Sequence, residues 1–162
     1  MLHLVTGDIL LSKAQALAHG VAPNDPFSSG LALSLRQQWP AMYKDFRHFC
    51  HTIHPKVGDV WIWAGADGKR IINLFTQHAA HDQGGQPGKA TAESVNHALR
   101  ELRHVIEKER LTSLALPRLA TGVGGLDWDT VSPLIEKHLG DLKLSIYVYS
   151  TFHKGEVANE PQ

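Results

Sequence analysis

Short apolar runs alternate with longer amphipathic segments along most of this chain. Six of the runs are rich in β-branched or aromatic residues and are short, which favours strands over helices. They span residues 2–6, 16–22, 59–63, 70–76, 113–117 and 144–149. The pattern therefore predicts a sheet built from six short strands.

Four longer segments repeat their apolar residues at helical spacing, and they span residues 29–39, 40–53, 91–110 and 129–139. Thr91 and Asp129 stand where N-caps belong, and Pro40 suits the first turn of a helix. Several predicted strands are almost wholly apolar, as expected when helices cover both faces of a sheet. We predict one three-layer α/β/α domain over residues 1–153 and a disordered tail over residues 154–162.

Composition removes several classes of partner. The 162 residues include 16 Lys and Arg and 16 Asp and Glu, so no global field recruits nucleic acid or an anionic membrane. Cys50 is the single cysteine, which rules out an intramolecular disulfide. No stretch resembles a signal peptide or a spanning helix, and we expect a cytoplasmic monomer. The histidines of the segment "HFCHTIH" point in scattered directions on a helix, so we expect no metal site.

Three strand-to-helix loops carry glycines where ligands bind in α/β sheets. They are "VTGDIL", "AHGVAPNDPFSSGLAL" and "PRLATGVGGLDW". Loop glycines expose main-chain N–H groups and helix N-termini add a positive dipole end, which together suit a pyrophosphate. Each loop taken alone is consistent with an ordinary connection, but their joint occurrence favours a phosphate site.

Two familiar phosphate motifs do not account for these loops. The segment "GGQPGKAT" is one residue short of a Walker loop between Gly84 and Gly88, and Ala90 replaces the required hydroxyl. The dinucleotide fingerprint G-x-G-x-x-G appears at no strand-to-helix junction. The pyrophosphate loop therefore belongs to another family.

From Leu2 to about Phe152 the chain resembles the macrodomain family, whose members bind ADP-ribose. The landmarks "VTGDIL", "GDV", "IINLFTQ" and "LALPRLATGVGGLDW" occur in the order that this family shows. The segment "LAHGVAPNDPFSSGLAL" is most similar to the branch that includes terminal ADP-ribose protein glycohydrolases and ADP-ribose 1″-phosphate phosphatases. This resemblance implies a mixed, mostly parallel six-stranded sheet in a three-layer sandwich.

The resemblance also implies roles for individual residues. Asp8 accepts a hydrogen bond from the adenine amino group, although an N-cap role is the alternative, and the loop from Ala120 to Gly125 wraps the diphosphate and the distal ribose. Either Tyr149 or Phe152 stacks on adenine. Asn24 holds a ribose hydroxyl or caps its own loop, and Asp127 approaches the phosphates. The full implied set of ligand-binding residues is Gly7, Asp8, Ile9, His19, Gly20, Asn24, Ser28, Ser29, Gly30, Leu31, Gln77, Ala120, Thr121, Gly122, Val123, Gly124, Gly125, Tyr149 and Phe152.

The chain departs from the family at positions that matter for chemistry. Ser28 and Ser29 replace two loop glycines, so this loop either approaches the ligand less closely or donates hydroxyl hydrogen bonds. Gln77 stands in place of the lysine of the covalent glycohydrolase branch, and Gly124 in place of its aspartate. A neutral amide forms no Schiff base, so the lysine-aspartate mechanism is excluded.

His19 is the remaining catalytic candidate, with a structural role at a strand end as the alternative. His78 and His81 lie near the expected cleft, either as a lid or as solvated residues. Two hypotheses follow, without any cofactor. The first is a hydrolase acting on ADP-ribose 1″-phosphate or on an ADP-ribosylated macromolecule. The second is a non-catalytic module that recognises ADP-ribose.

Overall fold

The computed structural model describes residues 1–80 and 87–162. Its sheet has six strands in the order β1-β6-β5-β2-β4-β3. The strands are β1 Leu2–Gly7, β2 Ala16–Val21, β3 Val60–Ala64, β4 Arg70–Phe75, β5 Ser113–Pro117 and β6 Ser145–Phe152. β3 runs antiparallel to β4, and the other neighbouring pairs are parallel. The predicted mixed, mostly parallel sheet is confirmed.

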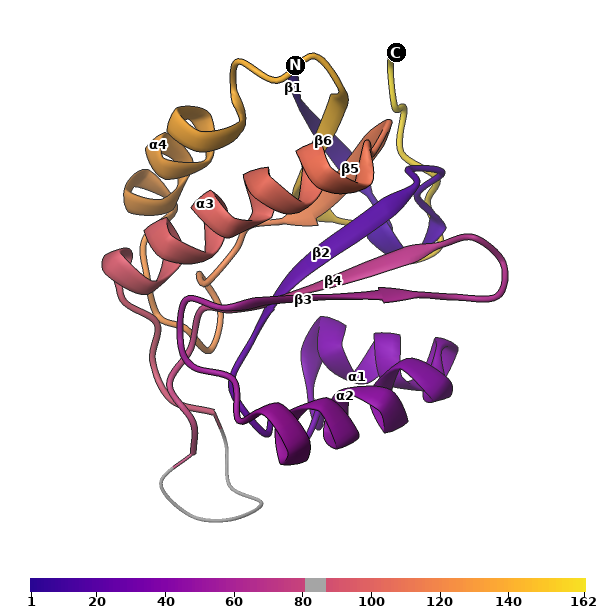
Figure 1. Cartoon of the computed structure of the whole chain (residues 1–162). Coiled ribbons are helices and arrows are strands. Elements are labelled where there is room, and N and C mark those ends of the chain that lie inside the picture. Colours follow the sequence, from indigo (N-terminus) through magenta and orange to yellow (C-terminus); the bar gives the residue numbers. More distant parts are fainter. Residues whose placement is uncertain (81–86) are drawn as a thin grey trace.

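Helices lie on both faces of this sheet (Figure 1). One face is covered by α1 Gly30–Gln38 and α2 Pro40–Ile53, the other by α3 Ala92–Glu109 and α4 Trp128–Leu139, and the short 3-10 helix η1 Ile9–Leu11 follows β1. Along β2, Ala16 and Ala18 join the apolar cluster that includes α3 and α4, whereas Leu17 and Val21 join the cluster that includes α2. Because both faces are covered, β2 is apolar at nearly every position.

The helix starts agree with the sequence in two of three places. The Thr91 side chain accepts from the Ser94 N–H and the Ser94 hydroxyl accepts from the Thr91 N–H, which forms a reciprocal cap. Pro40 occupies the first turn of α2. The prediction that Asp129 is an N-cap is wrong, because α4 begins at Trp128 and Asp129 lies in its first turn. An acidic side chain is favourable there too, beside the positive end of the helix dipole.

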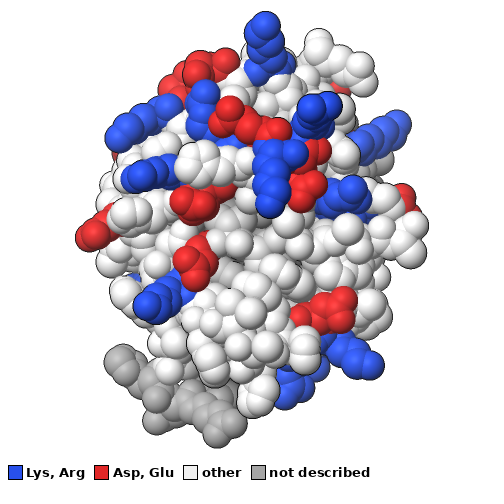
Figure 2. Space-filling model, viewed as in Figure 1, with Lys and Arg blue, Asp and Glu red and all other residues white. Residues whose placement is uncertain are grey.

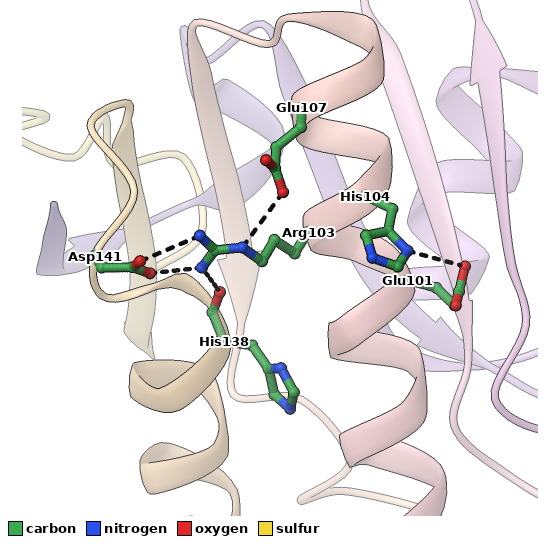
Figure 3. Close-up of polar contacts among 6 residues, drawn as sticks. All are labelled: Glu101, Arg103, His104, Glu107, His138 and Asp141. Atoms are coloured by element: carbon green, nitrogen blue, oxygen red, sulfur yellow. Dashed lines mark hydrogen bonds and ion pairs between the residues drawn. The ribbon is translucent and has the colours of Figure 1, made fainter.

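An ion pair joins Arg103 of α3 to Asp141, which follows the C-terminal end of α4 (Figure 3). Arg103 Nη1 lies 2.5 Å from Asp141 Oδ1 and Nη2 lies 3.1 Å from Asp141 Oδ2, which gives a two-pronged contact. Arg103 Nη1 also donates to the His138 carbonyl over 2.8 Å, and Glu107 lies 3.3 Å from Nε. The guanidinium holds the pKa of the Asp141 carboxyl below its usual value through these hydrogen bonds.

The C-terminal tail differs from the sequence-based expectation of disorder. After β6 the chain turns and runs back along the domain, so that both termini lie at the same end (Figure 1). Ala158 is buried in the α2-side cluster, and the Tyr147 hydroxyl donates to the Pro161 carbonyl over 2.7 Å. The tail has little apolar surface of its own, and its contacts with the sheet include hydrogen bonds from the Tyr147 and Tyr149 hydroxyls.

Charges of both signs are interspersed on the visible face of the molecule, mostly in its upper part (Figure 2). This distribution agrees with the balanced composition and shows no single-sign patch on that face. Among the described residues, no helix has the length and apolar character needed to cross a bilayer.

Candidate functional site

A cavity of about 280 Å³ opens at the carboxyl edge of the sheet. Its walls come from the end of β2, from the loop into α1, and from the loop that follows β5. It brings together these residues predicted from the sequence: His19, Gly20, Ser28, Ser29, Gly30, Leu31, Gln77, Ala120, Gly122, Val123 and Gly124. The two glycine-bearing loops therefore converge on one cavity, as the strand-to-helix pattern predicts.

Other predicted site residues do not line this cavity. Three of them, Asn24, Thr121 and Gly125, belong to the same loops as the lining residues. The others come from the expected adenine end of the site: Gly7, Asp8, Ile9, Tyr149 and Phe152. Their roles toward a ligand stay predictions. The predicted residues that line the cavity are thus among those expected at the diphosphate and distal ribose end of the site, and none is among those expected around adenine.

The loop after β5 owes its shape to its small residues. Ala120 has φ +61 and Gly125 has φ +77, both in the left-handed region. A Cβ on Gly124 would lie 2.7 Å from the Ala120 carbonyl oxygen, so a side chain there collides with the backbone. With the loop in this conformation, an aspartate at position 124 would collide with the backbone. A Cβ on Gly122, in contrast, would meet nothing within 4 Å.

The start of α1 faces the same cavity from the other side. Gly30 has φ +60, and the Ser29 N-cap makes no side-chain hydrogen bond to the first turn. Residues 28–32 line the cavity, so the first main-chain N–H groups of α1 lie beside it. An uncapped helix start with unsatisfied donors is a favourable place for an anion.

Asp25 organises the loop between β2 and α1, and the sequence analysis missed it. Its carboxylate accepts from the Ala22 N–H over 3.0 Å and from the Phe27 N–H over 2.9 Å. Asn24 and Phe27 both take positive φ, at 57° and 52°, around this anchor. Burial raises the pKa of Asp25 above its ordinary value. The signal in the sequence is the turn-forming "NDP" segment, in which an aspartate accepts hydrogen bonds from nearby main-chain N–H groups as readily as an asparagine does.

Five further residues line the cavity without having been predicted. They are Ala32, Pro87, Pro117, Arg118 and Leu119. Arg118 lies 5.4 Å from the centroid of the Trp128 ring, a cation–π contact that keeps it near the loop. Arg118 therefore lies at the edge of the cavity with its guanidinium against Trp128.

His19 is buried in the cavity wall with one ring nitrogen engaged. Its Nε2 lies 2.7 Å from Asn73 Oδ1, and the Asn73 amide nitrogen lies 3.5 Å from the Trp61 carbonyl oxygen. With the Asn73 amide nitrogen toward that carbonyl, the amide oxygen faces His19, and this orientation fits a proton on His19 Nε2. The other ring nitrogen, Nδ1, then carries a lone pair, and it has no hydrogen-bond partner among the described residues.

This environment bears on the chemistry of His19. Burial lowers the pKa of His19 from 6.5 to about 4, against the opposing effect of the Asn73 hydrogen bond. The imidazole is therefore neutral at pH 7 and a weak base, since general bases work best with a pKa near the working pH. The arrangement suits hydrogen-bond acceptance better than proton abstraction.

Gln77 occupies the wall between the two loops. Its side chain is 8% exposed, and Nε2 donates to the Gly88 carbonyl over 3.2 Å. The amide is thus used to hold the returning chain beside β4. His78 is exposed and pairs through its main chain with Gly88 and Lys89, while His81 lies outside the described residues.

At the expected adenine end, the chain contacts itself. Asp8 is 6% exposed; Oδ1 accepts from the Leu10 N–H and Oδ2 from the Gly155 N–H. The N-cap alternative for Asp8 is thereby observed, since the Leu10 bond caps η1. Tyr149 is buried with its hydroxyl donating to Glu160, whereas Phe152 is 62% exposed. Of the two stacking candidates, Phe152 is the one with a free surface.

The arrangement is that of an α/β protein with a cavity at the carboxyl edge of its sheet, where such folds bind ligands, lined by loop residues and a helix start. The chain belongs to the Macro domain family, whose sequence model matches residues 28–135. The resemblance inferred from the motifs is confirmed.

Individual relatives agree with this assignment. The chain is 28% identical over 154 residues to the DNA ADP-ribosyl glycohydrolase of Thermus aquaticus, covering 92% of this chain and 41% of that protein. It is 25% identical to the human ADP-ribose glycohydrolase OARD1, with 88% of both chains covered. The solved macrodomain of Thermus aquaticus DarG has a TM-score of 0.82 at 27% identity, covering 93% of this chain and 98% of that one. The chain spans about two fifths of the length of the first curated relatives it matches.

Proposed function

We propose that this chain binds ADP-ribose and hydrolyses an ADP-ribosyl derivative. The observation that carries the proposal is the convergence of the 120–125 loop and the uncapped start of α1 on one cavity. Main-chain N–H groups in such an arrangement complement a diphosphate without needing a net positive charge. Relatives whose names denote ADP-ribosyl glycohydrolases support the same ligand.

The substrate is ADP-ribose 1″-phosphate or an ADP-ribosyl adduct on a macromolecule. Hydrolysis breaks the bond between C1″ and the leaving oxygen or nitrogen, water supplies the hydroxyl at C1″, and the leaving group takes up a proton. The lysine-aspartate route is excluded, because Gln77 and Gly124 occupy those positions. Water is therefore the nucleophile.

Two groups are candidates to activate that water, namely His19 and a phosphate of the ligand itself. The low pKa of His19, about 4, makes the imidazole a weak base for this step. The main-chain donors of the 120–125 loop then stabilise the charge that develops in the transition state. His19 contributes by accepting a hydrogen bond.

The second candidate function is a reader module that binds ADP-ribose without chemistry. Gln77 favours the reader module, because its side-chain amide donates to the Gly88 carbonyl. Both functions share ADP-ribose binding and differ only in turnover. The cytoplasmic location and the monomeric state stay predictions from composition.

Calorimetric titration with ADP-ribose tests the shared part, and absence of heat at millimolar ligand would refute both functions. Turnover is then assayed with ADP-ribose 1″-phosphate, carboxylate-linked ADP-ribosyl protein and ADP-ribosylated DNA. Binding without turnover of any of the three leaves the reader module. Borohydride treatment during turnover should trap no adduct, and a trapped lysine would refute the water mechanism.

A further inference from the structure

The polar groups of Asp8 already have partners within the chain. Gly155 N donates to Asp8 Oδ2 over 2.9 Å, and Asp8 N donates to the Glu156 carbonyl over 2.7 Å. The dipeptide Gly155–Glu156 thus gives a donor to the Asp8 carboxylate and an acceptor to the Asp8 main-chain N–H. One edge of adenine offers the same pair, an exocyclic amino group beside a ring nitrogen.

The contact between the tail and Asp8 is built into the backbone. A Cβ on Gly7 would lie 2.8 Å from the Glu156 carbonyl oxygen and 2.9 Å from the Ala158 nitrogen. Gly155 turns the chain with φ +77, and Ala158 is buried. Glycine at position 7 is therefore required here by the tail, whatever a ligand also requires.

A second anchor holds the same segment further along. The Glu160 carboxylate accepts from the Lys13 N–H over 2.9 Å and from the Tyr149 hydroxyl over 2.7 Å. The Ser12 hydroxyl also donates to Glu160, over 2.5 Å. The tail thus engages Gly7, Asp8 and Tyr149, which are three of the residues expected at the adenine end. No residue of the tail lines the 280 Å³ cavity at the ribose and diphosphate end.

We propose that Gly155 and Glu156 compete with the adenine base for Asp8, and so set how strongly the site prefers ligands that carry the base. This inference rests on the proposed function. The apparent affinity for ADP-ribose is then lowered by the fraction of molecules in which the tail holds Asp8. A ligand without a base does not need Asp8 and is not affected.

The test compares the whole chain with a chain truncated after His153, each titrated with ADP-ribose and with ribose 5-phosphate. Truncation should tighten ADP-ribose binding on the order of tenfold and change ribose 5-phosphate binding by less than about twofold. Unchanged or weaker ADP-ribose binding by a folded truncated chain would overturn the proposal. An equal gain for both ligands would overturn it too.

The intact chain gives an independent measurement, which does not depend on the truncated chain folding. Hydrogen exchange of the Gly155 N–H, followed by NMR, should become faster when ADP-ribose saturates the protein, because the bond to Asp8 is broken. Equal or slower exchange in the bound state would refute the competition. Glu160→Ala should give part of the affinity gain, and Glu156→Ala, which keeps the main-chain carbonyl, should give none.

The two proposals fail in different ways. If neither the whole nor the truncated chain binds ADP-ribose, the proposed function fails and the competition fails with it. If the whole chain binds ADP-ribose while Gly155 stays protected, the proposed function stands and only the competition is refuted.

Discussion

Glu160→Ala tests whether the C-terminal tail is an ordered part of the domain. The carboxylate accepts three hydrogen bonds, from Ser12 Oγ over 2.5 Å, Tyr149 Oη over 2.7 Å and Lys13 N over 2.9 Å. Removing it leaves the half-buried Tyr149 hydroxyl and the Lys13 N–H to find water instead.

A hydrogen bond to a charged group contributes about 1.5–3 kcal/mol net, and solvent access to Glu160 reduces the sum of the three. We therefore expect the free energy of unfolding to fall by about 2 kcal/mol. For a domain of this size that lowers the melting temperature by about 4–8 °C. Urea unfolding followed by circular dichroism measures the change, and the m-value should stay the same.

Glu156→Ala is the matched control on the same tail. The Glu156 side chain is exposed and its carboxylate lies 4.0 Å from His153 Nδ1, so its loss should change the free energy of unfolding by less than about 0.5 kcal/mol. A Glu160→Ala protein as stable as the Glu156→Ala protein would show that the tail is not anchored in solution. The sequence-based expectation of a disordered tail would then stand.

Three further predictions concern the loop, the buried histidine and the ion pair between Arg103 and Asp141. Gly122→Val should leave the melting temperature nearly unchanged, because a Cβ there meets nothing within 4 Å. It should weaken ADP-ribose binding more than about tenfold, because the side chain fills the cavity. A normal affinity in calorimetry would show that Gly122 serves only the turn. The pKa of His19 is lowered in the folded state from 6.5 to about 4, so its contribution to stability is present above pH 6.5 and is lost as the pH falls toward 4. Over that range the free energy of unfolding, measured with urea, should therefore fall by about 3 kcal/mol more for the wild type than for His19→Gln. If the free energies of the two proteins changed with pH in parallel, the burial of His19 would be contradicted. The pKa of Asp141 is likewise lowered, from a usual value of 3.8, so the stability difference between wild type and Asp141→Asn should be largest above pH 3.8 and should shrink as the pH falls below it. A difference in melting temperature that stays constant down to strongly acidic pH would exclude the Arg103 pair as its origin.

The order of elements and the place of the 280 Å³ cavity could be predicted from local sequence. Strands and helices differ in hydrophobic period, and each period is set by backbone geometry within a few residues. The glycine loops after β2 and β5 could be placed at one edge, because the carboxyl ends of parallel strands meet there. Gln77 and Gly124 could be identified as departures from the covalent mechanism, since an amide and a hydrogen atom lack the required chemistry whatever their position.

Contacts between distant parts of the chain were decided only by the tertiary structure. The sequence of the tail is polar and predicts disorder, but the tail hydrogen-bonds to Asp8 and Lys13 near the N-terminus and to Tyr149 on β6. Likewise, a lone histidine has no predictable tautomer until Asn73 of the neighbouring strand lies 2.7 Å from it. Local sequence sets the hydrophobic period and the chemistry of each side chain. The burial of a side chain and its hydrogen-bond partners depend instead on which segments meet in space. Burial and partners in turn set the pKa of His19 and the availability of the Asp8 carboxylate.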